Sequence, residues 1–324
     1  MRILIVLDPV DSIKTYKDST YAMMCSARAR GHSIEVCEVG QLWLGEGHAW
    51  ADASVLTLSG PQLGEDGHDP HHWCTQAEPV STRISDFDAV LMRKDPPFDA
   101  EYVYATWLLE HAVREGANVF NEPRAIRDHG EKYSIAEFAQ FTADTIVTRD
   151  PVRLRAFVQR HGEAVFKLLD GMGGASIFRA RADDPNLSVI IETLNQFGAR
   201  SVMAQRFLPA ITEGDKRVLI IGGQVVPFAL ARIPKLGEAR GNLAAGGTGR
   251  AQPLSARDRE IAESLAPILW SRGLYLVGLD VIGDCLTEIN VTSPTCFREI
   301  ATQTGIDVAA MYIEGLEREV VRRS

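Results

Sequence analysis

The first part of the chain alternates short apolar runs with longer mixed segments. Residues 3–7 and 88–92 are almost continuously apolar, as expected of strands buried on both faces of a parallel sheet. The other elements expected here are a helix over residues 19–30 that Gly31 ends, a strand over 33–39, a helix over 100–115 and a strand over 118–121. This β-α-β order predicts a Rossmann-like parallel-sheet domain of about 120 residues.

The segments between these elements are less regular. No G-x-G-x-x-G motif follows the first strand, so we expect no dinucleotide site there. Residues 45–82 are rich in Gly, His, Asp and Pro and are expected to form loop or weak strand. Residues 68–74 contain His and Cys, but their spacing matches no closed zinc site and favours a solvated loop. Residues 93–99 follow a strand and are either part of a ligand-binding edge or a proline-stiffened connector with salt bridges.

After Pro123 the pattern changes to short strands, helices and a long hairpin. Helices are expected over residues 132–141, 151–161, 255–272 and 306–322, and strands over 145–147, 164–169, 176–178 and 201–207. Two alternating arms, residues 215–221 and 224–233, flank Gly222-Gly223 and predict a hairpin. Arg217 and Arg232 lie near the open end of that hairpin, where their side chains can reach the same neighbourhood.

A second hairpin is predicted over residues 278–291, with its turn at Gly283-Asp284. Glu288 and Asn290 are two residues apart and project from one face of a strand. With a strict two-residue turn, Asp280 would sit opposite Thr287 and face away from Glu288. The three oxygen ligands can share an Mg²⁺ site only if the loop is odd-numbered or the hairpin carries a bulge. An acidic edge hairpin that faces solvent is the alternative.

Two further stretches are glycine-rich. Residues 170–176 hold three glycines in four positions, which could form an anion-binding nest of backbone amides or a plain hairpin turn. The stretch lacks the G-K-[ST] ending of a P-loop. Residues 234–249 form a long loop that has Arg240 near its centre. A loop of this length in a compact domain is typically a functional lid or disordered, and this composition favours a lid.

Composition narrows the class of protein. A length of 324 residues indicates two or three domains. The net charge of −9 argues against a general nucleic-acid binder. Five widely spaced cysteines without a C-x-x-C pattern favour reduced thiols, and neither a signal peptide nor a membrane span is expected. These features predict a cytoplasmic protein.

Several phrases occur together in an order that resembles the ATP-grasp superfamily of carboxylate–amine ligases. Within it, the chain is similar from end to end to the bacterial glutathione synthetase family. The phrases that carry this resemblance span residues 92–99, 169–174, 231–234, 240–247 and 286–295. The resemblance implies an α/β (α+β) ATP-grasp fold with an N-terminal Rossmann-like, pre-ATP-grasp domain. The implied boundaries are 1–123 for the substrate-binding domain and 124–324 for the ATP-grasp domain, with a small lid subdomain over about 130–206 and a catalytic subdomain over about 207–324.

The resemblance also implies a reaction. ATP would phosphorylate the C-terminal carboxylate of γ-glutamylcysteine, and the amine of glycine would attack the acyl phosphate to give glutathione, ADP and phosphate. ATP and Mg²⁺, or Mn²⁺ in its place, are implied as cofactors. A homo-oligomer, a tetramer, is implied, with no nucleic-acid or membrane partner.

The site residues that the resemblance implies fall into four groups. The metal ligands are Asp280, Glu288 and Asn290. The ATP-binding residues are Lys132, Lys167, Gly171, Met172, Gly173, Gly174, Gln205, Phe207 and Leu208. The catalytic arginines are Arg217 and Arg240, which would stabilise the transferred phosphoryl group. The substrate-binding residues are Asp18, Ser19, Arg93, Arg232 and Thr295.

One position departs from the family pattern, because Arg206 stands where the family has a smaller polar residue. Contacts to adenine through backbone groups are compatible with this change. Another ATP-grasp peptide ligase, such as one that joins two D-alanines or adds glutamate, is the alternative within the enzyme class. A non-catalytic ATP-binding module is the alternative outside it. The presence of Asp280, Glu288, Asn290 and Arg240 together favours an enzyme.

Overall fold

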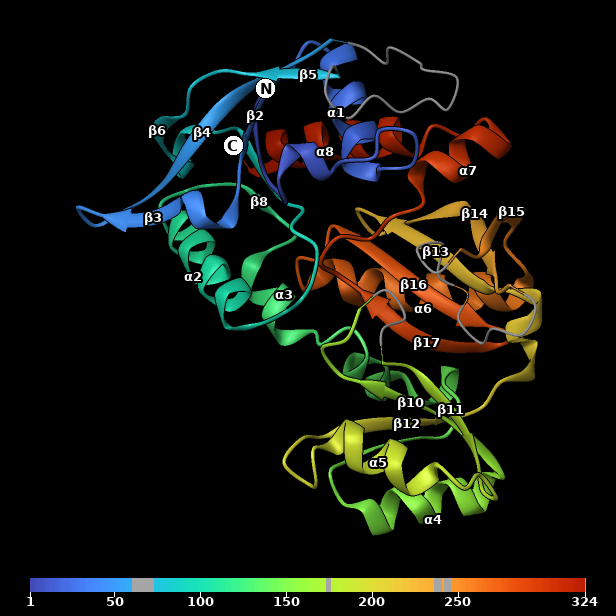
Figure 1. Ribbon diagram of the computed structural model, residues 1–324. Helices are drawn as coiled ribbons and strands as arrows, with labels where there is room; N and C mark the ends of the chain where they lie inside the picture. Colours follow the sequence, from blue (N-terminus) through green and yellow to red (C-terminus); the bar gives the residue numbers. More distant parts are fainter. Residues whose placement is uncertain (60–72, 173–175, 236–240, 242–245, 324) are drawn as a thin grey trace.

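The computed structural model of the chain describes residues 1–59, 73–172, 176–235, 241 and 246–323. Over these described residues, three β-sheets succeed one another along the molecule, each covered by helices (Figure 1). The first sheet and its helices form the top of the view, the five-stranded sheet lies in the middle, and the smallest sheet lies at the bottom. The predicted α/β (α+β) architecture is confirmed.

The first sheet has the strand order β3-β4-β2-β1-β7-β8, with β5 and β6 also paired to β4. The parallel strands are β1 (Arg2–Val6), β2 (Ser33–Cys37), β7 (Ala89–Met92) and β8 (Val119–Phe120). The antiparallel strands are β3 (Leu42–Gly45), β4 (His48–Leu58), β5 (Cys74–Gln76) and β6 (Val80–Arg83). The apolar runs of β1 and β7 are buried, as the continuous hydrophobic pattern predicts.

Side-chain caps fix where the helices of this sheet begin. Helix α1 (Ser19–Ala29) starts at Asp18, whose carboxylate accepts a hydrogen bond from the backbone N–H of Tyr21 at 2.7 Å. Helix α2 (Ala100–Arg114) starts in the same way at Asp99. The short helix α3 (Pro123–Asp128) follows β8 and was not predicted.

The expectation of loop or weak strand over residues 45–82 is wrong for its first half. β4 runs for 11 residues, and Ala49, Ala51 and Ala53 alternate along it with their side chains in the core. Alanine has a low β-propensity, so this period-two pattern does not stand out in the sequence. Residues 68–74 contain the His and Cys residues that were considered as zinc ligands, and residues 68–72 of this segment lie outside the described residues. Within the described ranges no group of three His, Cys, Asp or Glu could hold a metal ion.

The smallest sheet is antiparallel, in the order β11-β10-β12-β9. Its strands are β9 (Thr145–Thr148), β10 (Glu163–Leu168), β11 (Phe178–Arg181) and β12 (Val202–Arg206). Helices α4 (Pro151–His161) and α5 (Leu187–Asn195) cover one face, and Leu154, Phe166 and Ile191 meet in the core between them. The strand expected at 176–178 begins only at Phe178, and α5 was not predicted.

The third sheet is antiparallel, in the order β15-β14-β13-β16-β17. Its strands are β13 (Asp215–Ile221), β14 (Gln224–Ile233), β15 (Thr248–Pro253), β16 (Leu276–Ile282) and β17 (Cys285–Asn290). Helix α6 (Ala256–Ser271) lies on one face, where its N-terminal Ser255 and Asp258 form a capping box. Helices α7 (Phe297–Thr304) and α8 (Val308–Arg323) pack on the other face. Helix α7 was not predicted, because no side-chain cap marks its start at Cys296.

The C-terminal helix joins this sheet to the first one. α8 packs beside α1 (Figure 1), and its Tyr312 lies in one apolar core with Tyr21 and Tyr275. At the surface, Arg30 pairs with Glu314 and Glu317. The third sheet is thereby held against the first, which positions the cavity described below.

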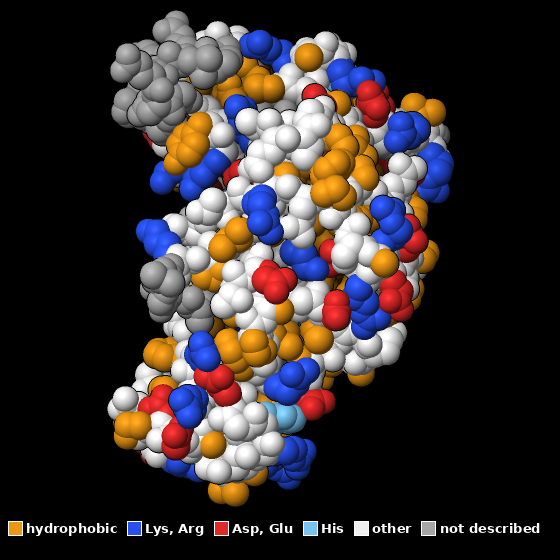
Figure 2. Space-filling view, turned by 90° about the vertical axis from the view of Figure 1, so that its right-hand side faces the viewer, with side chains coloured by type: hydrophobic (Ala, Val, Ile, Leu, Met, Phe, Trp, Pro, Cys, Tyr) orange, Lys and Arg blue, Asp and Glu red, His pale blue; other side chains and the backbone are white. Residues whose placement is uncertain are grey.

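Residues 132–141 were expected to form a helix, and they form a 3₁₀ segment (Tyr133–Phe141) that is kinked at Phe138. Ile135, Phe138 and Phe141 pack against the core under β16 and β17, and this packing replaces regular helix geometry. All five cysteines are free thiols. Among the described residues, no helix is both long and apolar enough to cross a membrane. On the face in Figure 2, basic and acidic side chains are interspersed.

Candidate active site

The hairpin formed by β16 and β17 carries the bulge that the sequence argument requires. Ile282 pairs with Cys285 and Val281 with Leu286, but Asp280 pairs with Glu288, so Thr287 is the extra residue. The hydroxyl of Thr287 donates to the backbone carbonyl of Asp280 at 3.1 Å, which fastens the bulge. Asp280 and Glu288 therefore lie opposite each other on the hairpin.

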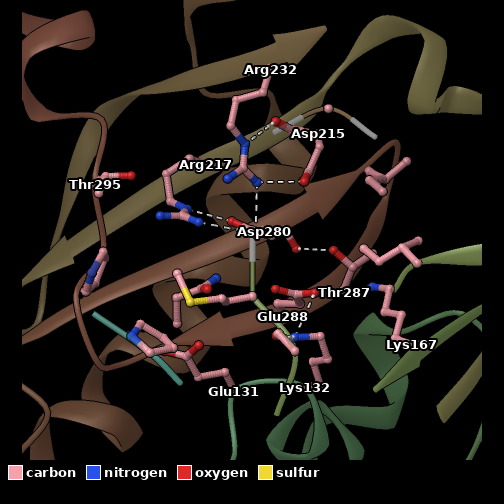
Figure 3. A pocket seen from close by; sticks show the side chains of 18 of the residues that line it. Glu131, Lys132, Lys167, Asp215, Arg217, Arg232, Asp280, Thr287, Glu288 and Thr295 are labelled. Atoms are coloured by element: carbon pink, nitrogen blue, oxygen red, sulfur yellow. Dashed lines mark hydrogen bonds and ion pairs between the residues drawn. The ribbon is translucent and has the colours of Figure 1, made fainter. Parts of the chain in front are cut away.

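Two arginines converge on Asp280 from the neighbouring hairpin (Figure 3). Arg217 Nε lies 2.6 Å from one oxygen of Asp280, and Arg232 Nη2 lies 2.8 Å from the other. Burial alone would raise the pKa of Asp280, but the two guanidinium groups outweigh it and hold that pKa well below its usual range. Asp280 is thus an anion fixed between two cations, and the predicted meeting of Arg217 and Arg232 is confirmed.

Asp215 is a member of this cluster that the sequence argument missed. Arg232 Nη2 donates to Asp215 Oδ2 at 2.6 Å, whereas Oδ1 of Asp215 is buried without a hydrogen-bond partner among the described residues. Burial, together with repulsion by Asp280 and Glu288, raises the pKa of Asp215 to about 6. Its position two residues before Arg217, on the same face of β13, was the available signal.

Two buried lysines face the hairpin from the other side. Lys167 Nζ lies 3.4 Å and Lys132 Nζ lies 3.8 Å from the same oxygen of Glu288, and Lys132 also donates to the carbonyl of Gly171. Both ammonium groups therefore lie at one carboxylate of the cavity, whereas Arg217 and Arg232 pair with Asp280 and Asp215. Lysine ammonium groups in such a position can pair with an anionic ligand.

A cavity of about 440 Å³ brings most of the predicted residues together. Its lining includes Asp18, Lys132, Lys167, Gly171, Met172, Gln205, Phe207, Leu208, Arg217, Arg232, Asp280, Glu288, Asn290 and Thr295. Gly173, Gly174 and Arg240 lie outside the described residues. The cavity extends from the start of α1, along the third sheet, to the edge of the smallest sheet.

Ser19 and Arg93 are buried behind this lining. The hydroxyl of Ser19 accepts from the backbone N–H of Phe297 at 3.2 Å. Arg93 donates to the hydroxyl of Thr20 at 3.1 Å and to the carbonyl of Pro294 at 3.0 Å. In this structure both residues fasten the walls of the cavity.

The end of β12 forms the wall on the side of the smallest sheet. Gln205 is buried and donates to the hydroxyl of Thr145 at 3.2 Å. Arg179 stacks over Phe207, with 3.8 Å between its guanidinium carbon and the ring centroid. The side chain of Arg206 is exposed, so the departure noted in the sequence leaves the backbone of this strand intact.

Glu131 is a second residue that the sequence argument missed. One of its carboxylate oxygens accepts from the backbone N–H groups of Val291 and Thr292 and from the Thr292 hydroxyl, at 2.8–3.0 Å. Its own carbonyl accepts from the N–H of Ile289 at 2.8 Å. Glu131 therefore ties the segment that carries Lys132 to the strand that carries Glu288 and Asn290. Its position next to Lys132, a predicted ATP-binding residue, is the sequence feature that could have indicated Glu131.

The donor atoms fit a hard divalent cation. Asp280 and Glu288 supply carboxylate oxygens, and Asn290 uses its amide nitrogen to donate to the Gly278 carbonyl at 3.1 Å, which leaves its amide oxygen available. The arginine contacts use only part of the acceptor capacity of Asp280, since an ionised carboxylate has about four acceptor positions. Mg²⁺ is usually held by one or two carboxylates together with phosphates and waters.

Comparison with known proteins identifies relatives of this chain. Residues 1–127 match the family model of the prokaryotic glutathione synthetase N-terminal domain, and residues 131–305 match that of its ATP-grasp domain. A glutathione synthetase from Ralstonia nicotianae is 59% identical over 324 residues, which cover 100% of this chain and 98% of that protein. One from Neisseria meningitidis serogroup A is 54% identical over 99% of this chain and 100% of that protein.

Solved structures support the fold. D-cycloserine synthetase DcsG has a TM-score of 0.65 at 15% identity, and the match covers 99% of this chain and 100% of that one. The ATP-grasp ligase PsnB, in a complex with its minimal precursor, Mg and ADP, has a TM-score of 0.61 at 19% identity over 99% of this chain and 98% of that one. The chain therefore belongs to the prokaryotic glutathione synthetase family, whose ATP-grasp ligases form glutathione in an ATP-dependent, ADP-releasing reaction.

Proposed function

We propose that the cavity activates the C-terminal carboxylate of γ-glutamylcysteine as an acyl phosphate, which the amine of glycine then attacks. The observation that carries this proposal is the convergence of two lysines, two arginines and the Asp280–Glu288 hairpin on one cavity (Figure 3). Phosphoryl transfer asks the protein mainly for positioning and charge neutralisation, and this arrangement supplies both.

ATP is assigned to the side of the cavity between the smallest and the third sheets. Lys132 and Lys167 would pair with phosphate oxygens, because both ammonium groups line the cavity close to the same oxygen of Glu288. Gln205, Phe207 and Leu208 would border the adenine, and the amides of residues 171–174 would cover the phosphates. Asp280, Glu288 and Asn290 would hold Mg²⁺, or Mn²⁺ in its place. The metal ion would neutralise charge on the phosphates.

The arginine side of the cavity is assigned to the carboxylate that reacts. Arg217 would stabilise the transferred phosphoryl group and Arg232 would hold a substrate carboxylate, since each guanidinium keeps N–H groups beyond those that Asp280 and Asp215 occupy. Asp18 and Thr295 line the cavity and would lie near the peptide substrate. Ser19 and Arg93 would support that end from behind.

Each of the three sheets belongs to a region with its own proposed function. Residues 1–123 would bind the peptide, residues of about 130–206 would form the small lid subdomain, and residues of about 207–324 would carry the chemistry. The loop from Ile233 to Gly249 would close over the acyl phosphate and exclude water, which would otherwise hydrolyse it. A cytoplasmic homotetramer is part of the proposal.

Arg240→Ala tests the role of this loop. We expect the ligase rate to fall by roughly 10²-fold or more while ATP binding stays within about twofold, because this arginine would act on the transferred phosphoryl group. Ligation kinetics and calorimetric titration with ATP measure the two effects separately. Equal loss of both would show that the loop has a structural role instead.

The proposal as a whole is tested by the products. Wild-type protein supplied with ATP, Mg²⁺, γ-glutamylcysteine and glycine should release phosphate and form the tripeptide. Phosphate release without the tripeptide would contradict the proposed ligation.

A further inference from the structure

Glu299 lies in the first turn of α7 and lines the cavity at the end formed by the start of α1. Its Oε2 atom is buried and has no hydrogen-bond partner among the described residues. Leaving a buried carboxylate oxygen unpaired is costly, and such groups in folded proteins are almost always satisfied. The atom is therefore available to accept a hydrogen bond from a cationic or N–H-bearing group of a ligand.

The surroundings of Glu299 combine both signs of charge. Asp18 lines the cavity beside it, and Lys14 and Lys17 line the same end. Burial is the main cause that raises the pKa of both Glu299 and Asp18, and each side chain also senses neighbouring charges, Lys17 in the case of Glu299 and Arg93 in the case of Asp18. A ligand group with an ammonium and a carboxylate on one carbon would match this end of the cavity.

The two amino-acid ends of the proposed substrates make different demands on the protein. Glycine must present an unprotonated amine to the acyl phosphate, and a carboxylate contact would favour its protonated form. The α-ammonium group of the γ-glutamyl residue takes no part in the reaction and can remain charged. A carboxylate at the end of the cavity nearest α1 therefore suits the γ-glutamyl end.

We propose that Glu299, with Asp18 beside it, binds the α-ammonium group of the γ-glutamyl residue and so makes the site selective for peptides that carry this group. This inference rests on the proposed function, because it assumes that γ-glutamylcysteine occupies the cavity. Neither Glu299 nor its role follows from the metal, ATP or acyl-phosphate assignments above.

The experiment compares two substrates, the dipeptide γ-glutamylcysteine and its analogue glutarylcysteine, and two variants of the protein. Glutarylcysteine has the same chain as γ-glutamylcysteine but lacks the α-ammonium group. Glu299→Gln keeps the size of the side chain and removes its charge, and Glu192→Gln, on the exposed face of α5, is the matched control. The KM of each dipeptide and of glycine is measured with each protein, and binding of each dipeptide is measured by calorimetry.

We expect Glu299→Gln to raise the KM and Kd of γ-glutamylcysteine by about 10- to 100-fold, the usual range for a lost charge-assisted hydrogen bond. The KM of glycine and kcat should stay within about twofold. Glutarylcysteine should bind wild type and Glu299→Gln equally, because it has no group for Glu299 to hold. Glu192→Gln should behave as wild type with every substrate.

Three results would overturn the inference. Equal weakening of both dipeptides would mean that Glu299 only supports the wall, an unchanged KM for γ-glutamylcysteine would mean that it binds no substrate, and a raised KM for glycine alone would assign it to the other amine. If Glu299→Gln does not fold, the wild type still decides, because it should bind γ-glutamylcysteine at least about tenfold more tightly than glutarylcysteine. The proposed function fails separately, when wild type binds the dipeptide but forms no tripeptide.

Discussion

Glu288→Gln is expected to lower kcat by roughly 10³-fold or more while the protein stays folded. Glu288 lies opposite Asp280 on the bulged hairpin and within 3.4 Å of Lys167, so its charge serves both the proposed metal ion and the two lysines. Glutamine keeps the shape but removes the anion, and a neutral amide is a far weaker ligand for a hard divalent cation.

The control for this variant is on the same hairpin. Asp284→Asn removes a carboxylate from the exposed turn of the hairpin and should leave kcat within about twofold. Circular dichroism and the thermal midpoint check that both variants fold. Full activity of Glu288→Gln in a folded protein would remove Glu288 from the metal site, and equal losses in both variants would point to damage to the hairpin.

Asp280→Asn is expected to abolish turnover and also to destabilise the fold by about 3–5 kcal/mol. The carboxylate of Asp280 is the anionic partner that Arg217 contacts, and it also pairs with Arg232. Removing its charge leaves Arg217 buried without an anionic partner among the described residues, which costs far more than the loss of a surface ion pair. Urea unfolding at neutral pH measures the change in the free energy of unfolding.

A double variant separates the stability of the fold from its chemistry. Asp280→Leu combined with Arg217→Met replaces the buried pair by apolar side chains, and such replacements often restore stability. We expect the free energy of unfolding to recover partly and turnover to remain undetectable. If activity recovered with stability, Asp280 would be a structural residue and the assigned metal site would be wrong.

The sequence predicts those elements of the fold in which the alternation of apolar and polar residues and the turn residues indicate the same structure. The arms Asp215–Ile221 and Gln224–Ile233 match the prediction, because alternating residues flank two glycines that a tight turn favours. The period-two pattern of strands also showed that Asp280 can lie opposite Glu288 only if the hairpin has an odd-numbered loop or a bulge. The structure meets this condition with Thr287 as the extra residue of a bulge.

The rest depends on contacts between segments far apart in the chain. β4 is a strand because its small alanines fit against the core, although alanine alone does not favour strands. Glu131 and Asp215 have no motif of their own, and their importance appears only when Val291 and Arg232 are placed beside them. Glu299 is likewise marked by an atom that has no hydrogen-bond partner in the described part of the chain, which no sequence pattern records.

The measurement that tests the central claim most directly is phosphate release from ATP with Mg²⁺, with γ-glutamylcysteine and glycine supplied separately and together. The account predicts sustained release only when both are present, with one tripeptide formed for each phosphate. Release with a different carboxylate and amine, but none with this pair, would keep the fold and contradict the proposed substrates. Binding of ATP without release for any pair would contradict the assignment of the cavity as an active site.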